Sequence, residues 1–201
     1  MGNRNLILGI TGSIASGKSL VAELLHKRGA AVLSADQLAR EVVEPGSPVL
    51  DSLVLQFGEE ILTRAGELDR ENLGRLVFAD EDARQRLNAL LHPAIAELSE
   101  RRLFELVKSG AALIVYEAPL LYEAGAEKRV DKVVVVTVDP EVQLQRIVAR
   151  DQLDESAARL RVAAQMPQEE KVARADYVID NSGSITDLEK EVVRLWHELG
   201  F

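Results

Sequence analysis

The sequence predicts an α/β fold: a parallel sheet flanked by helices, with a helical insertion. Two observations carry this prediction. Short apolar runs alternate with segments of helical spacing, which is typical of strand–helix–strand units. The first apolar run also leads into a glycine-rich turn and then a helix. At 201 residues the chain has the length of about one domain.

Five short apolar runs are expected to be the strands of the sheet. They are Leu6–Thr11, Ala30–Ser34, Ala112–Tyr116, Lys132–Thr137 and Tyr177–Asp180. The first is apolar on both faces, as strands buried in a parallel sheet are. Helical spacing predicts helices over Gly17–Arg28, with Gly29 as C-cap, over Asp36–Val43, and from Asp139 to about Arg150. The residues Thr186–Glu189 form a capping box that is expected to open the last helix.

The stretch between the second and third strands is long for one crossover and mostly helical in pattern. Candidate helices cover Val49–Phe57, Asp69–Phe78, Asp82–Leu91 and Pro93–Val107, so His92 and Pro93 are expected to lie between two helices. A helical hairpin over Asp154–Gln165 and Pro167–Ala175 carries several arginines. We therefore expect a helical insertion between the second and third strands.

Composition and charge exclude several classes of function. There are 24 basic and 33 acidic residues, a net charge of −9, which argues against a nucleic-acid backbone as partner. There is no cysteine, and three scattered histidines do not make a metal cluster. No apolar run is long enough to cross a membrane, and Met1–Asn5 show no signal peptide, so the cytoplasm is the expected compartment. Nothing in the sequence points to a particular oligomeric state.

The segment Gly12–Ser19 fits the phosphate-binding pattern G-x-x-x-x-G-K-[ST], and it has the required strand before it and helix after it. Gly17 allows the tight turn that points successive backbone N–H groups at phosphate oxygens. Lys18 adds a point charge, and the Ser19 hydroxyl can complete the shell of a Mg²⁺ ion. The alternative is an ordinary glycine turn with a surface lysine. The motif favours a nucleoside triphosphate with Mg²⁺ as ligand.

Three acidic residues follow predicted strands, at the edge where α/β proteins bind ligands. Asp36 could take the proton of an alcohol that attacks the γ-phosphate, or it could be a helix N-cap. Glu117 could lie in the second shell of Mg²⁺ or hold a water, or it could be a solvated loop carboxylate. Asp139 precedes a proline, so capping explains it; a phosphate or metal role is the weaker alternative.

Several blocks resemble the dephospho-CoA kinases, and the resemblance runs nearly end to end. The blocks are Gly9–Ser19, Ser34–Gly46, Leu68–Arg70, Leu91–Pro93, Pro119–Glu123, Arg161–Gln165 and Asp176–Asn181. The resemblance implies a P-loop kinase core of residues 1–35, 111–145 and 175–201, a helical CoA-binding insertion of residues 36–110, and a small helical lid of residues 146–174. It also implies that the chain phosphorylates the ribose 3′-hydroxyl of dephospho-CoA with ATP and Mg²⁺, giving coenzyme A and ADP. ATP and dephospho-CoA are then the expected partners.

The resemblance also implies roles for individual residues. Asp36 corresponds to the general base and Lys18 to the phosphate clamp. The residues expected to bind ATP are Gly12, Ala15, Ser16, Gly17, Lys18, Ser19, Leu20, Arg146 and Asn181, and Ser19 is the expected Mg²⁺ ligand. The residues expected to bind the acceptor are Asp36, Arg40, His92, Glu123 and Arg161.

Several of these residues have structural alternatives. Arg40 could form a surface ion pair with Asp36 four residues earlier. His92 could be a structural cap, Glu123 a loop anchor and Asn181 a turn residue. At least one arginine among Arg146, Arg150, Arg159 and Arg161 is expected to act on phosphate, although each alone could be a solvated helix residue.

The chain departs from the family pattern at two positions. Ala15 stands where the family usually has glycine, which we expect to be compatible with the loop if the φ angle of Ala15 is negative. Ser34 stands where a further acid often occurs. Two other functions are kept as alternatives. A GTPase-like switch would need Asn-Lys-x-Asp and Asp-x-x-Gly motifs, which we do not find, and a kinase for another alcohol or a nucleoside monophosphate would need a different acceptor region.

Overall fold

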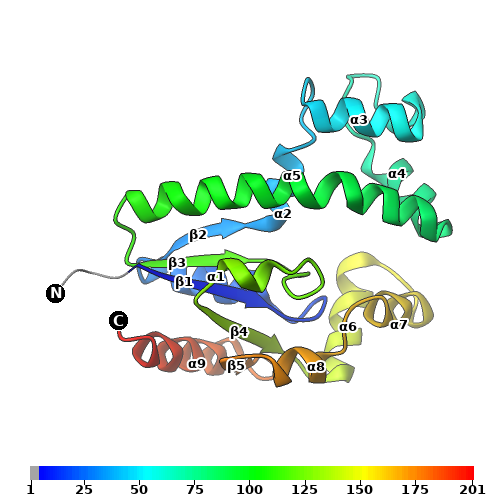
Figure 1. Cartoon of the computed structure of the whole chain (residues 1–201). Coiled ribbons are helices and arrows are strands. Elements are labelled where there is room, and N and C mark those ends of the chain that lie inside the picture. The colour runs from blue at the N-terminus through cyan, green and yellow to red at the C-terminus, as the bar shows by residue number, and fades with distance from the viewer. Residues whose placement is uncertain (1–4) are drawn as a thin grey trace. The chain divides into compact units, whose positions relative to one another are not determined.

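The computed structural model describes residues 5–201. The expectation that Met1–Asn5 contain no signal peptide therefore falls, apart from Asn5, outside the described residues. Its sheet has five parallel strands in the order β2-β3-β1-β4-β5 (Figure 1). The strands are β1 (Leu6–Thr11), β2 (Ala31–Ser34), β3 (Leu113–Glu117), β4 (Lys132–Thr137) and β5 (Tyr177–Asp180). The predicted α/β class and all five predicted strands are confirmed, with β2 and β3 beginning one residue later than expected.

The central strand β1 leads directly into the glycine-rich turn. It pairs with β3 on one side, where Ile10 lies opposite Glu117, and with β4 on the other, where Thr11 lies opposite Val135. Because all strands run parallel, the turn after Thr11 and the residues after Glu117 emerge at the same edge of the sheet. This register places Glu117 beside the turn, as the sequence pattern predicted.

Two helices from opposite ends of the chain cover the core of the sheet. Helix α1 (Lys18–Lys27) and helix α9 (Ile185–Glu198) pack against each other and against β1 and β5. Leu25 and Leu195 are buried there with strand residues such as Ile10 and Val134. Between β3 and β5 the chain forms four further helices, which are η2 (Ala126–Arg129), α6 (Pro140–Asp151), α7 (Glu155–Ala163) and α8 (Gln168–Ala173).

The predicted capping box at Thr186–Glu189 is wrong by two residues. Helix α9 begins at Ile185, and its N-cap is Ser184, whose hydroxyl accepts a hydrogen bond from the Asp187 N–H at 3.2 Å. The same hydroxyl donates to the Asp187 carboxylate at 2.6 Å. The sequence did not distinguish the two candidates, because Ser184 with Asp187 and Thr186 with Glu189 have the same three-residue spacing. The path of the chain from β5 decides which of the two residues stands just before the helix.

The chain divides into two compact units, each described here by itself. The sheet unit contains the described residues up to Ser34 together with Leu103–Phe201, and the helical unit contains Ala35–Arg102. The helical unit is built from α2 (Ala35–Glu41), α3 (Pro48–Phe57), η1 (Glu59–Ile61), α4 (Arg70–Ala79) and most of α5 (Glu81–Lys108). Its own small core contains Val43, Leu53, Ile61 and Leu73.

The predicted break at His92 and Pro93 is wrong, because both lie inside the continuous helix α5. Proline lacks the N–H that would bond to the carbonyl of Ala89, and its ring crowds that carbonyl, so the sequence suggested two helices. Several helical turns on each side of Pro93 keep the helix intact, and the proline itself is exposed, where its ring meets solvent. His92 is therefore an exposed helix residue and not a cap between helices.

Among residues 5–201, no helix combines the length and the apolar character needed to cross a bilayer.

Candidate active site

The turn between β1 and α1 has a backbone that only glycine permits at two positions. Gly17 has a φ of +91°, and a Cβ atom there would lie 2.1 Å from Nδ2 of Asn181. Gly12 has a φ of +152°, and a Cβ atom there would lie 2.2 Å from the carbonyl oxygen of Val136. These two glycines therefore fix the path of the phosphate-binding turn, hereafter the P-loop (Gly12–Ser19).

The condition under which Ala15 was expected to be compatible with the loop, a negative φ, is not met. Ala15 has a φ of +58°, and Gln152 is the other non-glycine residue in the left-handed region within the described residues. The path between Gly12 and Gly17 requires this conformation, so alanine is forced into a region that costs an L-residue roughly 1–2 kcal/mol. Sequence alone misses this because φ depends on what the neighbouring peptide groups bind.

Polar side chains hold the P-loop from within. Lys18 is only 7% exposed, and its Nζ donates to the Ser13 carbonyl at 2.9 Å. The Ser19 hydroxyl donates to Oε1 of Glu117 at 2.6 Å. Glu117 is buried at the end of β3, so the alternative of a solvated loop carboxylate is wrong.

A hydroxyl and a carboxylate oxygen side by side suit a hard cation such as Mg²⁺. The pair formed by Ser19 and Glu117 is this donor set, at the mouth of the P-loop. Within the described part of the chain, no group of three or more His, Asp or Glu side chains could hold a metal by itself. The residues present therefore fit an ion that arrives with, and is mostly held by, the phosphates of a nucleotide.

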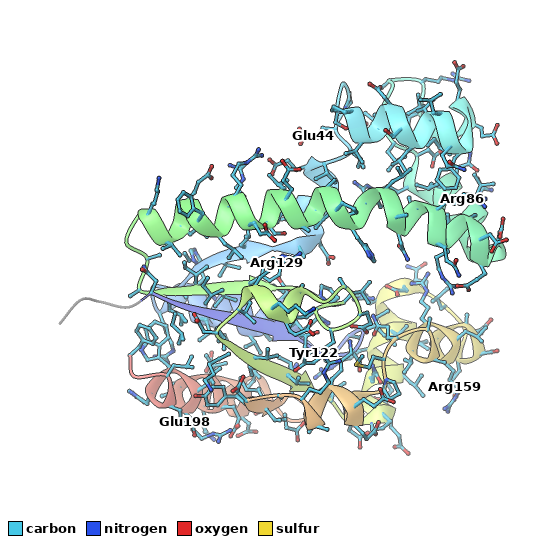
Figure 2. All side chains as sticks on the ribbon, in the orientation of Figure 1. Glu44, Arg86, Tyr122, Arg129, Arg159 and Glu198 are labelled. Atoms are coloured by element: carbon cyan, nitrogen blue, oxygen red, sulfur yellow. The ribbon has the colours of Figure 1, made fainter. Side chains whose placement is uncertain are left out.

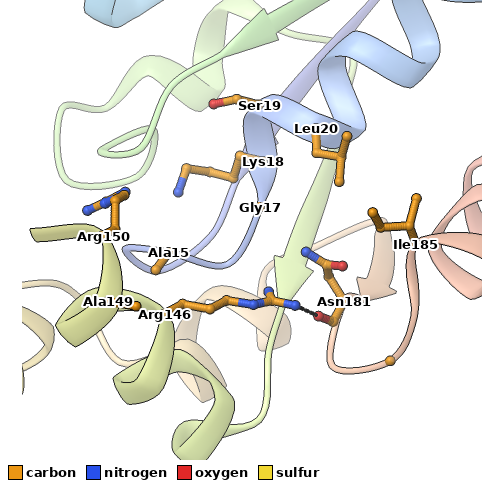
Figure 3. Close-up of a pocket in the computed structure, with 11 residues that line it drawn as sticks. Ala15, Gly17, Lys18, Ser19, Leu20, Arg146, Ala149, Arg150, Asn181 and Ile185 are labelled. Atoms are coloured by element: carbon orange, nitrogen blue, oxygen red, sulfur yellow. Dashed lines mark hydrogen bonds between the residues drawn. The ribbon is translucent and has the colours of Figure 1, made fainter.

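An open pocket of about 670 Å³ adjoins the P-loop. It is lined by Ala15, Gly17, Lys18, Ser19, Leu20, Arg146, Ala149, Arg150, Asn181, Gly183 and Ile185 (Figure 3). The pocket contains the side chains of three cations, Lys18, Arg146 and Arg150, and an apolar side formed by Leu20 and Ile185. Such a combination suits a ligand with an anionic end and a flat apolar end.

Asn181 and Arg146, both predicted nucleotide-binding residues, line this pocket and are bonded to each other. Arg146 donates to the Asn181 carbonyl at 2.9 Å, as the dashed line in Figure 3 marks. The Asn181 side chain is 5% exposed, and its Nδ2 donates to the Ser16 carbonyl at 2.8 Å. Asn181 is therefore more than a turn residue, since it ties the strand β5 end to the P-loop.

The arginines of the predicted lid lie in different environments. Asp151 accepts from both Arg150 and Arg161, at 2.7 Å each, and the hydrogen bond from Arg150 is the main reason that the pKa of Asp151 is lowered. Arg150 lines the pocket, whereas Arg161 does not line it and donates a hydrogen bond to Asp151. Arg159 pairs with Glu155 on the exposed surface of α7 (Figure 2). Arg146 and Arg150 are thus the two arginines of this region that face the pocket.

Glu123 acts as an anchor for the loop between α7 and α8. Its carboxylate pairs with Nζ of Lys171 at 2.9 Å and accepts from the Met166 N–H at 3.2 Å. Lys171 is completely buried and also donates to the Pro119 carbonyl. The loop-anchor alternative is present in the structure, and a role of Glu123 in binding the acceptor stays a prediction.

Asp139 caps helix α6, as its sequence context indicated. Its carboxylate accepts from the N–H groups of Glu141 and Val142, at 2.8 and 3.3 Å.

In the helical unit, the predicted acceptor residues Asp36, Arg40 and His92 are exposed. Asp36 lies in the first turn of α2 and is not its N-cap, because the helix begins at Ala35. The structure shows no ion pair between Asp36 and Arg40 within the described part of this unit. Burial, and then the like charge of Arg40, lower the pKa of Arg70. Arg70 is thus a further cation near Arg40, which the block Leu68–Arg70 contained but which was not singled out.

The sequence analysis also missed two glutamines that form hydrogen bonds to the P-loop backbone. The Ile14 N–H donates to Oε1 of Gln165 at 2.7 Å, and Nε2 of Gln143 donates to the Ile14 carbonyl at 2.8 Å. Gln165 belongs to the block Arg161–Gln165 that resembles the kinase family, and this was a usable signal. Gln143 had no sequence signal, because a glutamine on an amphipathic helix is usually a surface residue.

Comparison with known proteins gives consistent matches. The family model for dephospho-CoA kinase matches residues 6–187. A dephospho-CoA kinase of Syntrophotalea carbinolica is 54% identical over 194 residues, covering 96% of this chain and 92% of that protein. A solved structure from Thermus thermophilus has a TM-score of 0.83 at 38% identity, covering 98% of this chain and 100% of that one. The dephospho-CoA kinase of Campylobacter jejuni has a TM-score of 0.73 at 32% identity, covering 96% of each chain.

Proposed function

Because the chain belongs to the dephospho-CoA kinase family, we propose that its P-loop and Asp36 together transfer the γ-phosphoryl group of ATP to the ribose 3′-hydroxyl of dephospho-CoA. The enzyme is a kinase that phosphorylates dephospho-CoA to coenzyme A with ATP. The observation that carries the residue assignment is the pocket in which Lys18, Arg146 and Arg150 meet beside the P-loop. The expected compartment is the cytoplasm.

On the nucleotide side, the P-loop holds the phosphates and the apolar side of the pocket holds the base. The backbone N–H groups of the loop and the N-terminus of α1 favour anionic oxygens. Lys18 neutralises charge that builds up between the β- and γ-phosphates, and such stabilisation in a preorganised site accounts for much of the rate. Leu20 and Ile185 offer an apolar surface for the adenine ring. Gly12, Ser16 and Asn181 keep the loop in its binding shape.

Ser19 and Glu117 would hold Mg²⁺ together with the phosphates of ATP. When bound, the ion supplies charge neutralisation of the β- and γ-phosphate oxygens. The Ser19 hydroxyl provides a direct oxygen ligand, and the Glu117 carboxylate accepts hydrogen bonds from the Ser19 hydroxyl or from ion-bound water. Both residues stand at the end of rigid elements, which favours a fixed geometry.

On the acceptor side, Asp36 takes the proton of the ribose hydroxyl. As the acceptor oxygen forms its bond to the γ-phosphorus, the bond to the bridging oxygen of ADP breaks, and the proton moves to the Asp36 carboxylate. Arg40 and Arg70 are two cations of the helical unit that suit the diphosphate of dephospho-CoA. His92, Glu123 and Arg161 are proposed to contact the acceptor, as the resemblance implies.

The segment of residues 146–174 is proposed to close over the nucleotide. Its two pocket arginines, Arg146 and Arg150, would then approach the transferring phosphoryl group while water is excluded. Amide exchange with and without a bisubstrate mimic measures this movement. Protection of the P-loop without added protection of residues 151–174 would contradict a closing lid.

The proposed activity is tested by offering a panel of acceptors with Mg·ATP and measuring the products by mass spectrometry. Dephospho-CoA should gain one phosphate at the ribose 3′-oxygen, and AMP, adenosine and pantothenate should gain none. The Lys18→Ala variant is the matched control for a contaminating kinase. GTP in place of ATP separates an ATP-dependent kinase from a guanine-nucleotide switch, since the latter would bind GTP and leave dephospho-CoA unchanged.

A further inference from the structure

Ala15 is the strained point of the P-loop, and its left-handed conformation needs an explanation. A non-glycine residue with a φ of +58° persists only where the surroundings determine the backbone on both sides. Ala15 is the third residue of a backbone turn that the Ser16 N–H closes by donating to the Ser13 carbonyl at 3.2 Å. In addition, side chains bind the peptide groups of Ile14 and Ser16. The relevant contacts come from three elements that are far apart in the sequence.

Three side-chain amides hold the peptide groups around Ala15. Gln165, in the connection between α7 and α8, accepts from the Ile14 N–H at 2.7 Å. Gln143, on α6, donates to the Ile14 carbonyl at 2.8 Å. Asn181, after β5, donates to the Ser16 carbonyl at 2.8 Å. Gln143 and Asn181 are 6% and 5% exposed, so their bonds to the loop form in a nearly dry environment.

We propose that Gln143, Gln165 and Asn181 form an amide clamp that holds Ala15 in the left-handed conformation and thereby keeps the P-loop in its phosphate-binding shape. They are positioning residues, since they act through the loop backbone. The clamp replaces the conformational freedom that a glycine would provide at position 15. Within it, Gln165 is the member that joins the P-loop to the helical hairpin of α7 and α8.

The donor and acceptor pattern of the clamp also defines which backbone groups face the nucleotide. The Ile14 N–H is bonded to Gln165 and the Ser16 N–H to the Ser13 carbonyl, so in this structure these two N–H groups are not available to phosphate. Amide side chains suit this task because they are neutral. A carboxylate next to the loop would repel the triphosphate, and a cation would compete with the loop N–H groups for the triphosphate. A neutral side chain holds the backbone without changing the charge of the pocket.

The first test uses the different roles of the two glutamines. Gln165 contributes an acceptor to Ile14 and Gln143 a donor, so glutamate preserves the bond at position 165 and abolishes it at position 143. We expect Gln165→Leu, Gln143→Leu and Gln143→Glu to weaken ATP binding by about 3- to 10-fold, the size of one net hydrogen bond. Gln165→Glu keeps the acceptor but adds a negative charge beside the triphosphate, so this variant is compared with Gln165→Leu by hydrogen exchange of the free protein rather than by ATP binding. Gln145→Leu, an exposed glutamine on the same helix, is the matched control and should bind ATP as the wild type does.

Hydrogen exchange gives a direct readout at the loop. The Ile14 amide should exchange faster in Gln165→Leu than in the wild type, and at near the wild-type rate in Gln165→Glu. Equal exchange in all three proteins would show that Gln165 does not hold this peptide and would overturn its place in the clamp.

The decisive experiment is a double-mutant cycle with Ala15→Gly, measured as the dissociation constant of Mg·ATP. If the clamp maintains the left-handed alanine, Gln165→Leu should cost markedly less in the Ala15→Gly background than with Ala15 present, because glycine takes positive φ without help. Equal losses in both backgrounds would overturn the inference. The inference rests on the proposed function, and the two fail differently: a wild-type protein that does not bind ATP contradicts the proposed site, whereas a wild type that binds ATP with no coupling to position 15 contradicts the clamp alone.

Discussion

The proposed functional residues of the sheet unit and of the helical unit differ in burial and in hydrogen bonding. In the sheet unit Lys18, Glu117 and Asn181 are nearly buried, and each is bonded to another part of the P-loop or its neighbours. In the helical unit Asp36 and Arg40 are exposed on α2, a helix of seven residues. The proposed nucleotide-binding residues are therefore held by hydrogen bonds within the chain, whereas the proposed acceptor-binding residues Asp36 and Arg40 lie exposed on a short helix.

The hydrophobic cores of the two units differ in size, and the larger core belongs to the sheet unit. The sheet unit buries apolar residues from four strands and two helices, including Ile10 and Leu195. The core of the helical unit is much smaller and is centred on Leu53 and Ile61. Since stabilisation rises with the apolar area removed from water, the sheet unit is the more rigid support for a site that must hold its geometry within a fraction of an ångström.

The largest expected effect comes from Asp36→Asn, which tests whether an exposed residue of the helical unit can carry the chemistry. Asparagine keeps the shape of the side chain but cannot take a proton at neutral pH. We expect kcat to fall by roughly 10²–10⁴-fold with saturating substrates, the usual contribution of a positioned acid or base. The dissociation constant of ATP should change little, because its phosphates bind in the sheet unit.

The control for Asp36→Asn is its melting temperature. Asp36 is not the N-cap of α2, so the variant should melt close to the wild type. A fall in melting temperature that accounts for the lost rate would favour a structural role. Normal turnover with normal melting would remove Asp36 from the mechanism and leave Glu117 as the next carboxylate to test.

The second prediction concerns Lys18→Ala, in the P-loop of the sheet unit. Removing the ammonium takes away a charge that acts mainly in the transition state, so kcat should fall by on the order of 10²-fold and the KM for ATP should rise. The KM for dephospho-CoA should remain near its wild-type value. Lys18→Arg is the matched variant that keeps the charge but changes its shape. A Lys18→Ala enzyme with normal turnover would mean that the loop is not a phosphate site.

The sequence predicted the fold and the position of the P-loop between a strand and a helix well, because their signals are local. Apolar runs specify the strands, and the glycines and Lys18 of the P-loop lie within eight consecutive residues. The contacts that hold the loop are non-local: Gln165 and Asn181 are more than 150 residues from their partners. Their positions depend on how the chain folds, and no spacing rule reports them. The continuous helix through Pro93 was missed for a related reason, since a local breaker signal was outweighed by the helical turns on both sides.

The third prediction compares matched leucines in the two cores. Leu53→Ala in α3 and Leu25→Ala in α1 each remove a completely buried side chain and should each cost about 2–5 kcal/mol of unfolding free energy. Because Leu53 belongs to the helical unit, its loss should raise the KM for dephospho-CoA more than the KM for ATP. Leu25→Ala, in the helix that follows the P-loop, should show the reverse. Equal effects of both variants on both KM values would mean that the units do not divide the substrates between them.

The smallest expected effect concerns two surface ion pairs, one in each unit. Asp176 pairs with Lys132 at 2.7 Å and accepts from the Val133 N–H at 2.8 Å, where β5 begins beside β4. In the helical unit, Glu41 pairs with Arg102 at 2.7 Å. Exposed pairs contribute little, so Asp176→Asn should lower the melting temperature by about 1–3 °C at pH 7, and Glu41→Gln by less, because Asp176 also satisfies a backbone N–H.

The pH dependence of Asp176→Asn separates this bonding from a packing effect. Burial raises the pKa of Asp176, but the hydrogen bonds from Lys132 and Val133 and the charge of Lys132 outweigh it, so the pKa lies below its ordinary value. A carboxyl with a lowered pKa in the folded protein stabilises it above the unfolded pKa, about 3.9, and this stabilisation is lost as the pH falls through the folded pKa. The difference in melting temperature between wild type and Asp176→Asn should therefore be constant from pH 7 to about pH 5 and then shrink in more acidic solution. A difference that stays the same down to pH 3 would show that the order at this edge of the sheet comes from packing and not from the ionised carboxylate.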